Sequence, residues 1–164
     1  MEAIKSNKEQ KVNIIWEEYV DPPLQDISST EISTIEAIIG FILPADYKSF
    51  IVDKQGLVPS KEVIESNYLA PTPFGPLFHV LENCSSEHIL YSALEKFNKW
   101  KDLYPNIFPI ADAGSTGNFF AYNFKIDHSN PPIIFVNVEE DPDAPEAFIH
   151  VSKDINELLN NLKD

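Results

Sequence analysis

The apolar residues in the first third of the chain recur at helical spacing. From Ile32 to Ile39 they return every three or four positions, which places them on one face of a helix. Ser29 or Thr30 is expected to cap this helix, because a hydroxyl side chain at that position accepts a hydrogen bond from the first turn. Gly40 follows the last apolar residue and is expected to end the helix.

A second helix is expected after a short apolar hinge, Phe41–Leu43. Pro44 suits the first turn of this helix, because the N–H that proline lacks would have no partner there. The apolar residues between Tyr47 and Ile51 fall on one face, and Gly56 is expected to end the helix. The two segments together predict a pair of amphipathic helices.

A third helix is expected to begin at Ser85 or Ser86 and to run to Trp100, with apolar residues at helical spacing throughout. Prolines punctuate the preceding segment, Leu57–Leu77, which also carries large apolar groups. A flexible linker would not carry so many of them, so we expect irregular structure laid across the core. Leu77–Leu81 is a candidate for a short strand.

From residue 107 onward, short apolar and aromatic runs are separated by turns, a pattern typical of strands. Strands that meet at short turns pair antiparallel, and the helices are separated from the strands along the chain. The expected fold class is therefore α+β, with a central, mostly antiparallel sheet and flanking helices. Ser152 is expected to cap a final helix. The expected strands are Ile107–Ala111, Phe119–Phe124, Ile133–Val138 and Ala147–Val151.

The length of 164 residues fits one domain with a substantial core. Residues 1–12 carry charge and little periodicity, and we interpret them as a loose arm. Residues 12–16 fit a short helix and a strand equally well. We therefore divide the chain into an N-terminal arm, residues 1–29, whose packing on the domain is left open, and a single domain, residues 30–164.

The formal net charge of −14 narrows the class of partner. The 12 basic residues are all lysines, too few and too outnumbered to grip a phosphate backbone, so we expect no nucleic-acid partner. Anionic membrane surfaces would repel the chain. The charge favours encounter with basic partners, although acidity also serves solubility alone.

Cysteine usage and the N-terminal pattern indicate the compartment. Cys84 is the only cysteine, so no disulfide forms within the chain, which fits a reducing environment. The N-terminus has no apolar run of the kind a signal peptide needs, and no segment approaches the length of a membrane span. We expect a soluble protein of the cytoplasm.

Candidate catalytic groups are few. The loop Asp112–Asn118 holds two glycines, but no lysine follows the second, so a tight turn is preferred over a phosphate cradle. The four histidines lack metal-ligand spacing such as His-Glu-x-x-His. Cys84 and His88 are a conceivable thiol–imidazole pair, but their places near a helix start do not guarantee contact. We expect no catalytic residue, no metal and no cofactor.

The acidic loop, residues 139–146, is a candidate contact surface for a basic partner. Its carboxylates lack the spacing and central glycine of a calcium-binding loop, and two prolines stiffen it. The first interpretation is a solvated loop and the second is a partner contact. The residues assigned to that contact are Glu139, Glu140, Asp141, Asp143 and Glu146.

Two stretches carry a family resemblance: Leu43–Phe50 with Gly56 downstream, and Phe108–Tyr122. Together they resemble the SUKH superfamily, which includes fungal cell-wall-assembly regulators and many bacterial immunity proteins. The order of the expected elements also fits, and the resemblance covers most of Thr30–Lys163. The arm before Thr30 and the proline-rich middle depart from the pattern.

The resemblance implies an α+β fold without enzymatic activity. It also implies binding, since the bacterial members bind and neutralise toxins, often nucleases. Our hypothesis is a non-enzymatic immunity protein that neutralises a cognate toxin domain of basic character. One alternative is a regulatory scaffold module that binds an endogenous protein or peptide. Another is a small hydrolase or transferase that uses Cys84 and a histidine.

Overall fold

The computed structural model describes residues 13–114 and 116–164. The loose arm expected at residues 1–12 lies outside the described residues. Residues 13–29 contact the rest of the chain: Val20 and Ile27 are buried, and the Ile27 N–H donates to the carbonyl of Val52 (2.9 Å).

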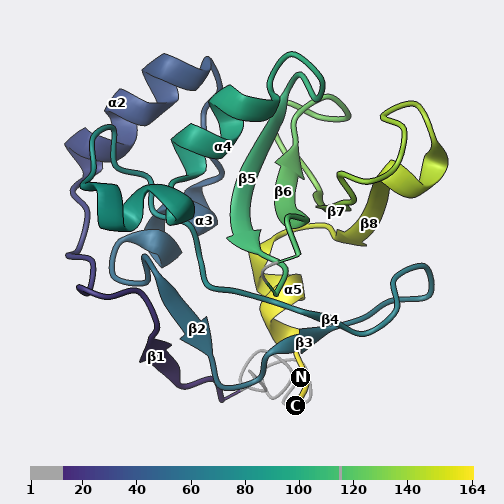
Figure 1. Cartoon of the computed structure of the whole chain (residues 1–164), viewed down its shortest axis with the longest axis horizontal. Helices are drawn as coiled ribbons and strands as arrows, with labels where there is room; N and C mark the ends of the chain where they lie inside the picture. The colour runs from purple at the N-terminus through teal and green to yellow at the C-terminus, as the bar shows by residue number, and fades with distance from the viewer. Residues whose placement is uncertain (1–12, 115) are drawn as a thin grey trace, which may run out of the picture.

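The centre of the fold is a four-stranded antiparallel sheet in the order β5-β6-β7-β8 (Figure 1). Neighbours in the sheet are consecutive in the chain, so the sheet is a meander. The expected α+β class is confirmed, and each of the four strands expected from residue 107 onward is present within two residues at either end. The strands are β5 (Ile107–Asp112), β6 (Phe119–Asn123), β7 (Ile133–Val136) and β8 (Phe148–Ser152).

Both faces of the sheet centre are covered, because every residue of β6 and β7 is buried. Residues two apart on a strand share a face, so Phe120 and Tyr122 point to the same side. There the Phe120 ring lies 5.0 Å from that of Phe74, and the Tyr122 ring lies 5.4 Å from that of Tyr47, measured between centroids. Burial on both faces explains why these strands are apolar at every position but Asn123 instead of alternating.

The first expected helix is α2 (Ser29–Ile39). Its N-cap is Ser28, not Ser29 or Thr30. The Ser28 hydroxyl accepts a hydrogen bond from the backbone N–H of Glu31, and the Glu31 carboxylate accepts one from the backbone N–H of Ser28. This reciprocal pair is a capping box, which satisfies N–H groups at the helix start.

Gly40 ends α2 as expected, in the left-handed region at φ 84°, which a residue with a Cβ rarely adopts. The second helix, α3 (Ala45–Ile51), follows the hinge. It ends before Gly56, contrary to expectation, and a run of turns separates the two. The N–H of Gly56 donates instead to the carbonyl of Leu77 (3.0 Å).

A buried carboxylate holds the hinge between α2 and α3. The Glu36 side chain is 8% exposed, and its Oε2 accepts a hydrogen bond from the backbone N–H of Leu43 (2.8 Å). The same oxygen lies 3.0 Å from Nζ of Lys48 on α3. The hinge is thus fixed by a charged group as well as by its apolar residues.

The helix expected to run unbroken to Trp100 is interrupted at Ser92. A 3-10 helix, η1 (Ser86–Tyr91), precedes the break, and α4 (Ala93–Trp100) follows it and packs on β5. Ser92 Oγ accepts a hydrogen bond from the backbone N–H of Glu95 (3.1 Å). Ser92 therefore begins a new helix as its N-cap instead of continuing the earlier one.

The proline-rich segment lies along the outer edge of β5. The N–H of Gly75 donates to the carbonyl of Asp112 (2.8 Å), and the N–H of Asp112 donates to that of Pro76 (2.9 Å). The N–H of Phe78 donates to the carbonyl of Ile110 (2.9 Å). The segment thus occupies an edge that would otherwise present unpaired backbone groups.

The strand expected at Leu77–Leu81 is replaced by isolated bridges, from Leu77 to Ala111 and from His79 to Ser92. Two small antiparallel ribbons complete the described strands: β1 pairs with β2, and β3 pairs with β4. These strands are β1 (Trp16–Glu18), β2 (Leu57–Pro59), β3 (Val63–Ile64) and β4 (Thr72–Pro73).

The closing helix is α5 (Ile155–Asn160), which contacts β8 and α3. Its N-cap is Asp154 and not Ser152. The Asp154 carboxylate accepts a hydrogen bond from the backbone N–H of Glu157 (2.8 Å). The Ser152 hydroxyl donates instead to the carbonyl of Asp154 (2.9 Å).

Candidate functional site

The acidic loop joins β7 to β8, on the right of Figure 1, and includes a short 3-10 helix, η2 (Pro145–Ala147). Backbone hydrogen bonds close it. The N–H of Ala144 donates to the carbonyl of Asp141 (2.8 Å), and the N–H of Asn137 donates to that of Ala147 (2.9 Å). The loop therefore has a defined shape.

The five carboxylates assigned to partner contact lie together in this loop. Glu140 is half-buried, and the other four are exposed. One of them also supports the loop, since the Asp141 carboxylate accepts a hydrogen bond from the backbone N–H of Asp143 (2.9 Å). Within the described part of the chain, none of the five forms an ion pair with a lysine. Their negative charge therefore faces solvent without an ion-paired lysine among the described residues.

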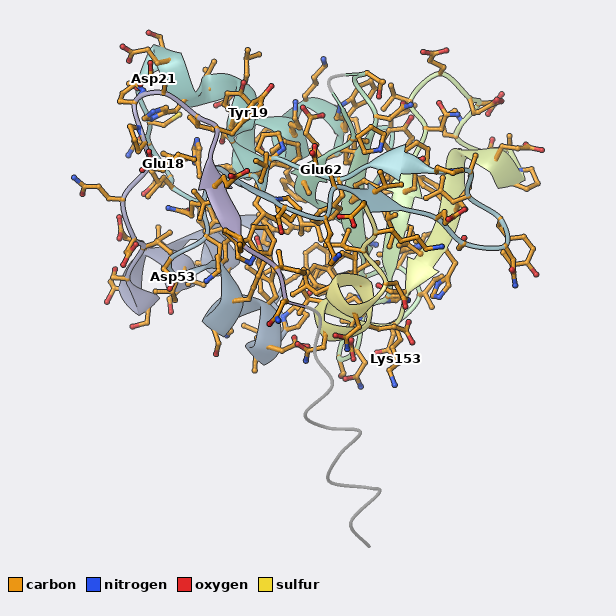
Figure 2. All side chains as sticks on the ribbon, turned by 90° about the horizontal axis from the view of Figure 1, so that it is seen from below. Glu18, Tyr19, Asp21, Asp53, Glu62 and Lys153 are labelled. Atoms are coloured by element: carbon orange, nitrogen blue, oxygen red, sulfur yellow. The ribbon has the colours of Figure 1, made fainter. Side chains whose placement is uncertain are left out.

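A second acidic surface surrounds a hollow of about 610 Å³ at the start of α3. Its lining comes from four parts of the chain: residues 44–46, Tyr122 of β6, residues 129–131, and Lys153 with Asp154 between β8 and α5. Lys153 lies at the molecular surface near α5 (Figure 2). The volume falls within the range of ligand pockets, roughly 300–1,000 Å³.

Tyr122 is one of the residues that line this hollow. Its side chain is fully buried, and its hydroxyl has no hydrogen-bond partner among the described residues. Burial raises the pKa of the phenol, and the nearby Tyr47 and the charges of Asp46 and Asp154 raise it further. The Tyr122 hydroxyl therefore stays protonated, within electrostatic reach of two carboxylates that line the hollow.

The two carboxylates of the hollow are fixed by backbone hydrogen bonds. Oδ1 of Asp46 accepts from the N–H of Tyr47 (2.8 Å), and Oδ1 of Asp154 accepts from the N–H of Glu157 (2.8 Å). Neither carboxylate forms an ion pair in the described part of the chain. Each one thus turns one oxygen to the backbone and keeps the other available.

The structure does not support the pairing of Cys84 with His88. Nε2 of His88 lies 2.7 Å from the carbonyl of Pro22, and Nδ1 lies 3.4 Å from Oγ of Ser85. Burial raises the pKa of the Cys84 thiol, and the charge of Glu95 adds to the shift. A raised pKa disfavours the thiolate, which is the nucleophilic form of cysteine.

The described residues form neither a metal-binding cluster nor a membrane-spanning helix. Among the described residues, no group of three or more His, Cys, Asp or Glu side chains is arranged to hold a metal ion. None of the helices in the described part of the chain combines the length and the apolar run needed to cross a bilayer.

The hollow and the acidic loop are separate surfaces, because none of the five loop carboxylates lines the hollow. Sequence reasoning found the loop through its run of acidic residues but did not assign Asp46, Tyr122 or Asp154 to a site. Asp46 and Tyr122 belong to the two stretches that carry the family resemblance. Asp154 could have been noticed as an N-cap residue before the last apolar helical run.

An antiparallel sheet, helices packed beside it and two surfaces with an excess of carboxylates define an acidic α+β domain. More particularly, the chain belongs to the SMI1 / KNR4 family (SUKH-1), whose model matches residues 26–161. This places it in the SUKH superfamily, whose members are generally non-catalytic immunity proteins. A comparison with curated proteins gives no match.

Proposed function

We propose that this protein is a non-enzymatic immunity protein of the cytoplasm, which binds a toxin domain and covers the surface through which the toxin acts. The observation that carries the proposal is the family match over residues 26–161. The net charge of −14 supports a toxin of basic character. Nuclease domains have such surfaces, because they bind a polyanion.

The acidic loop would speed the encounter with the toxin. Its exposed carboxylates have no lysine partners among the described residues, so their field extends into solvent. Complementary charge mainly raises the association rate, whereas desolvated apolar contacts set the dissociation rate. The loop is therefore assigned to encounter, not to the whole affinity.

The function is tested by co-expressing this protein with the products of neighbouring genes. Expression of the toxin alone should arrest growth, and co-expression should restore growth and yield a complex that purifies intact. Sustained arrest despite soluble expression of both proteins would contradict the proposal.

The role of the loop is tested by replacing its five carboxylates with the corresponding amides. We expect association with the toxin at low salt to slow roughly tenfold, with a flatter dependence on salt. The matched control removes the same total charge elsewhere. An equal slowing in the control would remove the loop from the account. The control positions, all exposed, are Glu17, Glu18, Asp21, Glu62 and Glu87.

A second candidate function is a regulatory scaffold module that binds an endogenous protein or peptide. The match to the SMI1 / KNR4 family supports this candidate too, because the SUKH superfamily includes fungal cell-wall-assembly regulators as well as immunity proteins. The genomic neighbourhood discriminates between the two: a toxin gene beside this one favours immunity, and its absence favours the scaffold.

A further inference from the structure

The lining of the hollow at the start of α3 includes a buried polar group that no described residue satisfies. Buried hydroxyls are nearly always hydrogen-bonded in folded proteins. The Tyr122 hydroxyl is fully buried and has no partner among the described residues, yet Tyr122 lines an open hollow. An unsatisfied group in that position points to a ligand that completes its hydrogen bonding.

The charges around the hollow indicate a cationic ligand. Asp46 and Asp154 bring two carboxylates, and Lys153 brings one ammonium group, so the lining is negative overall. Both carboxylates use Oδ1 to accept a backbone N–H, which leaves Oδ2 of each for a ligand. Anions would meet two carboxylates here and only one lysine.

The segments that lead into the lining of the hollow at residues 44 and 129 carry exposed apolar residues, which suits a protein partner. The hinge residue Phe41 stacks on Phe124 at 4.6 Å, which holds the hinge against the segment that follows β6. Each of these segments carries an exposed apolar residue, Ile42 at 69% and Ile126 at 70%. Apolar contacts around a charged group exclude water and strengthen an interface.

We propose that this hollow receives an arginine side chain of the partner protein, with the guanidinium group between Asp46 and Asp154 above the Tyr122 hydroxyl. A guanidinium group has five N–H donors in one plane, enough to serve both carboxylates and the phenol oxygen at once. An ammonium group has three donors and no such planar fork. The inference rests on the proposed function only for the identity of the partner.

The probe for this site is N-acetyl-arginine amide, titrated into the full chain and followed by the backbone amide signals of the protein. We expect saturable chemical-shift changes centred on the amides of Asp46, Tyr122 and Lys153. The affinity obtained from them should fall as salt is added, because salt screens the attraction between the charges. The matched probe is N-acetyl-citrulline amide, which has the same shape without the charge. It is expected to cause no saturable shift at these positions.

Substitutions in the hollow give the second test. Asp46→Asn and Asp154→Asn keep a side-chain oxygen that can accept the same backbone N–H and remove a charge, so each should weaken arginine binding about tenfold. Tyr122→Phe should weaken it about threefold. Tyr104→Phe is the matched control, since Tyr104 also has a buried hydroxyl without a described partner but does not line the hollow. It should leave binding unchanged.

Lys153→Gln should change arginine binding in the opposite direction from the substitutions of Asp46 and Asp154. Removing the single positive charge from the lining should tighten arginine binding about threefold. Weakening caused by this substitution would contradict the charge argument.

Three outcomes overturn the proposal: no saturable shift with the arginine probe, equal shifts with the citrulline probe, or saturable binding of inorganic phosphate to the same residues. None of them depends on a toxin. A chain that restores growth beside a toxin but fails these titrations would keep the proposed function and lose the arginine site.

Discussion

The polar residues that matter most in this fold are those that the core encloses. Glu36 and His79 are 8% and 0% exposed, and each one is bonded to backbone groups. A pattern of apolar positions predicts which residues are buried, but it gives no account of buried polar groups. Glu36 and His79 are therefore the positions at which single substitutions test the structure most directly.

Replacing Glu36 by alanine should lower the free energy of unfolding by about 2–3 kcal/mol. The change leaves the buried N–H of Leu43 without its acceptor and Lys48 without its partner. The measurement is urea unfolding of the variant against the wild type. Glu95→Ala, at an exposed position of α4, is the control and should stay within about 0.5 kcal/mol. Equal losses in the two variants would refute the role of the hinge carboxylate.

His79 should make stability depend on pH. Its Nδ1 accepts the N–H of Leu81 (3.3 Å), so Nε2 carries the proton and donates to the carbonyl of His88 (3.0 Å). Burial lowers the pKa of this imidazole, an effect that the charge of His88 reinforces and the backbone hydrogen bond opposes. Because Nδ1 faces a donor, protonation is disfavoured in the folded state.

The lowered pKa sets the sign of the effect. Above the unfolded pKa of about 6.5 both states are neutral and the stability is complete. As the pH falls through about 6.5, the unfolded state binds the proton first, so the free energy of unfolding declines. The free energy of unfolding, measured with urea, should decline more steeply between about pH 7.5 and pH 6 in the wild type than in His79→Gln. Parallel curves would exclude this contribution.

At the scale of elements, the four strands of the central sheet were predictable, whereas the strand expected at Leu77–Leu81 and the unbroken third helix are not formed. The strands could be found because β6 and β7 are buried on both faces and are apolar at every position but Asn123. The prediction of one unbroken third helix was wrong because the apolar spacing continues through Ile89 and Leu90, although these residues are 46% and 69% exposed. Spacing alone does not reveal that Ser92 ends one helix and begins another.

Ser92→Ala should destabilise the protein by about 1 kcal/mol. The substitution removes the hydroxyl that accepts the backbone N–H of Glu95 at the start of α4. Thermal unfolding measures the loss. Ser85→Ala is the matched control, because Ser85 precedes η1 without a capping hydrogen bond from its side chain. A loss in Ser85→Ala as large as in Ser92→Ala would argue against the cap.

At the scale of the molecule, the candidate sites differ in how far the sequence reveals them. The acidic loop is one continuous run of the chain, so its charge is visible before folding. The hollow draws Asp46, Tyr122 and Asp154 from three distant segments, and only the packing of α3 and α5 against the sheet unites them. Chemistry assembled by tertiary contacts is not readable from local patterns.

The net charge of −14 should make the fold more stable in salt. Like charges repel one another more in the compact state, and added salt screens that repulsion. We expect the midpoint of thermal unfolding to rise between about 20 and 200 mM sodium chloride. A falling midpoint would mean that the described ion pairs, such as Lys48–Glu36, outweigh the general repulsion.

The central claim is that this domain neutralises a toxin by binding it. The most direct measurement titrates the purified protein into the toxin domain identified by the co-expression experiment, while the toxin's own activity is followed. We expect toxin activity to fall to the background when about one equivalent has been added, and we expect that neutralising the acidic loop slows the fall without changing its end point. Undiminished toxin activity at excess protein would contradict the account.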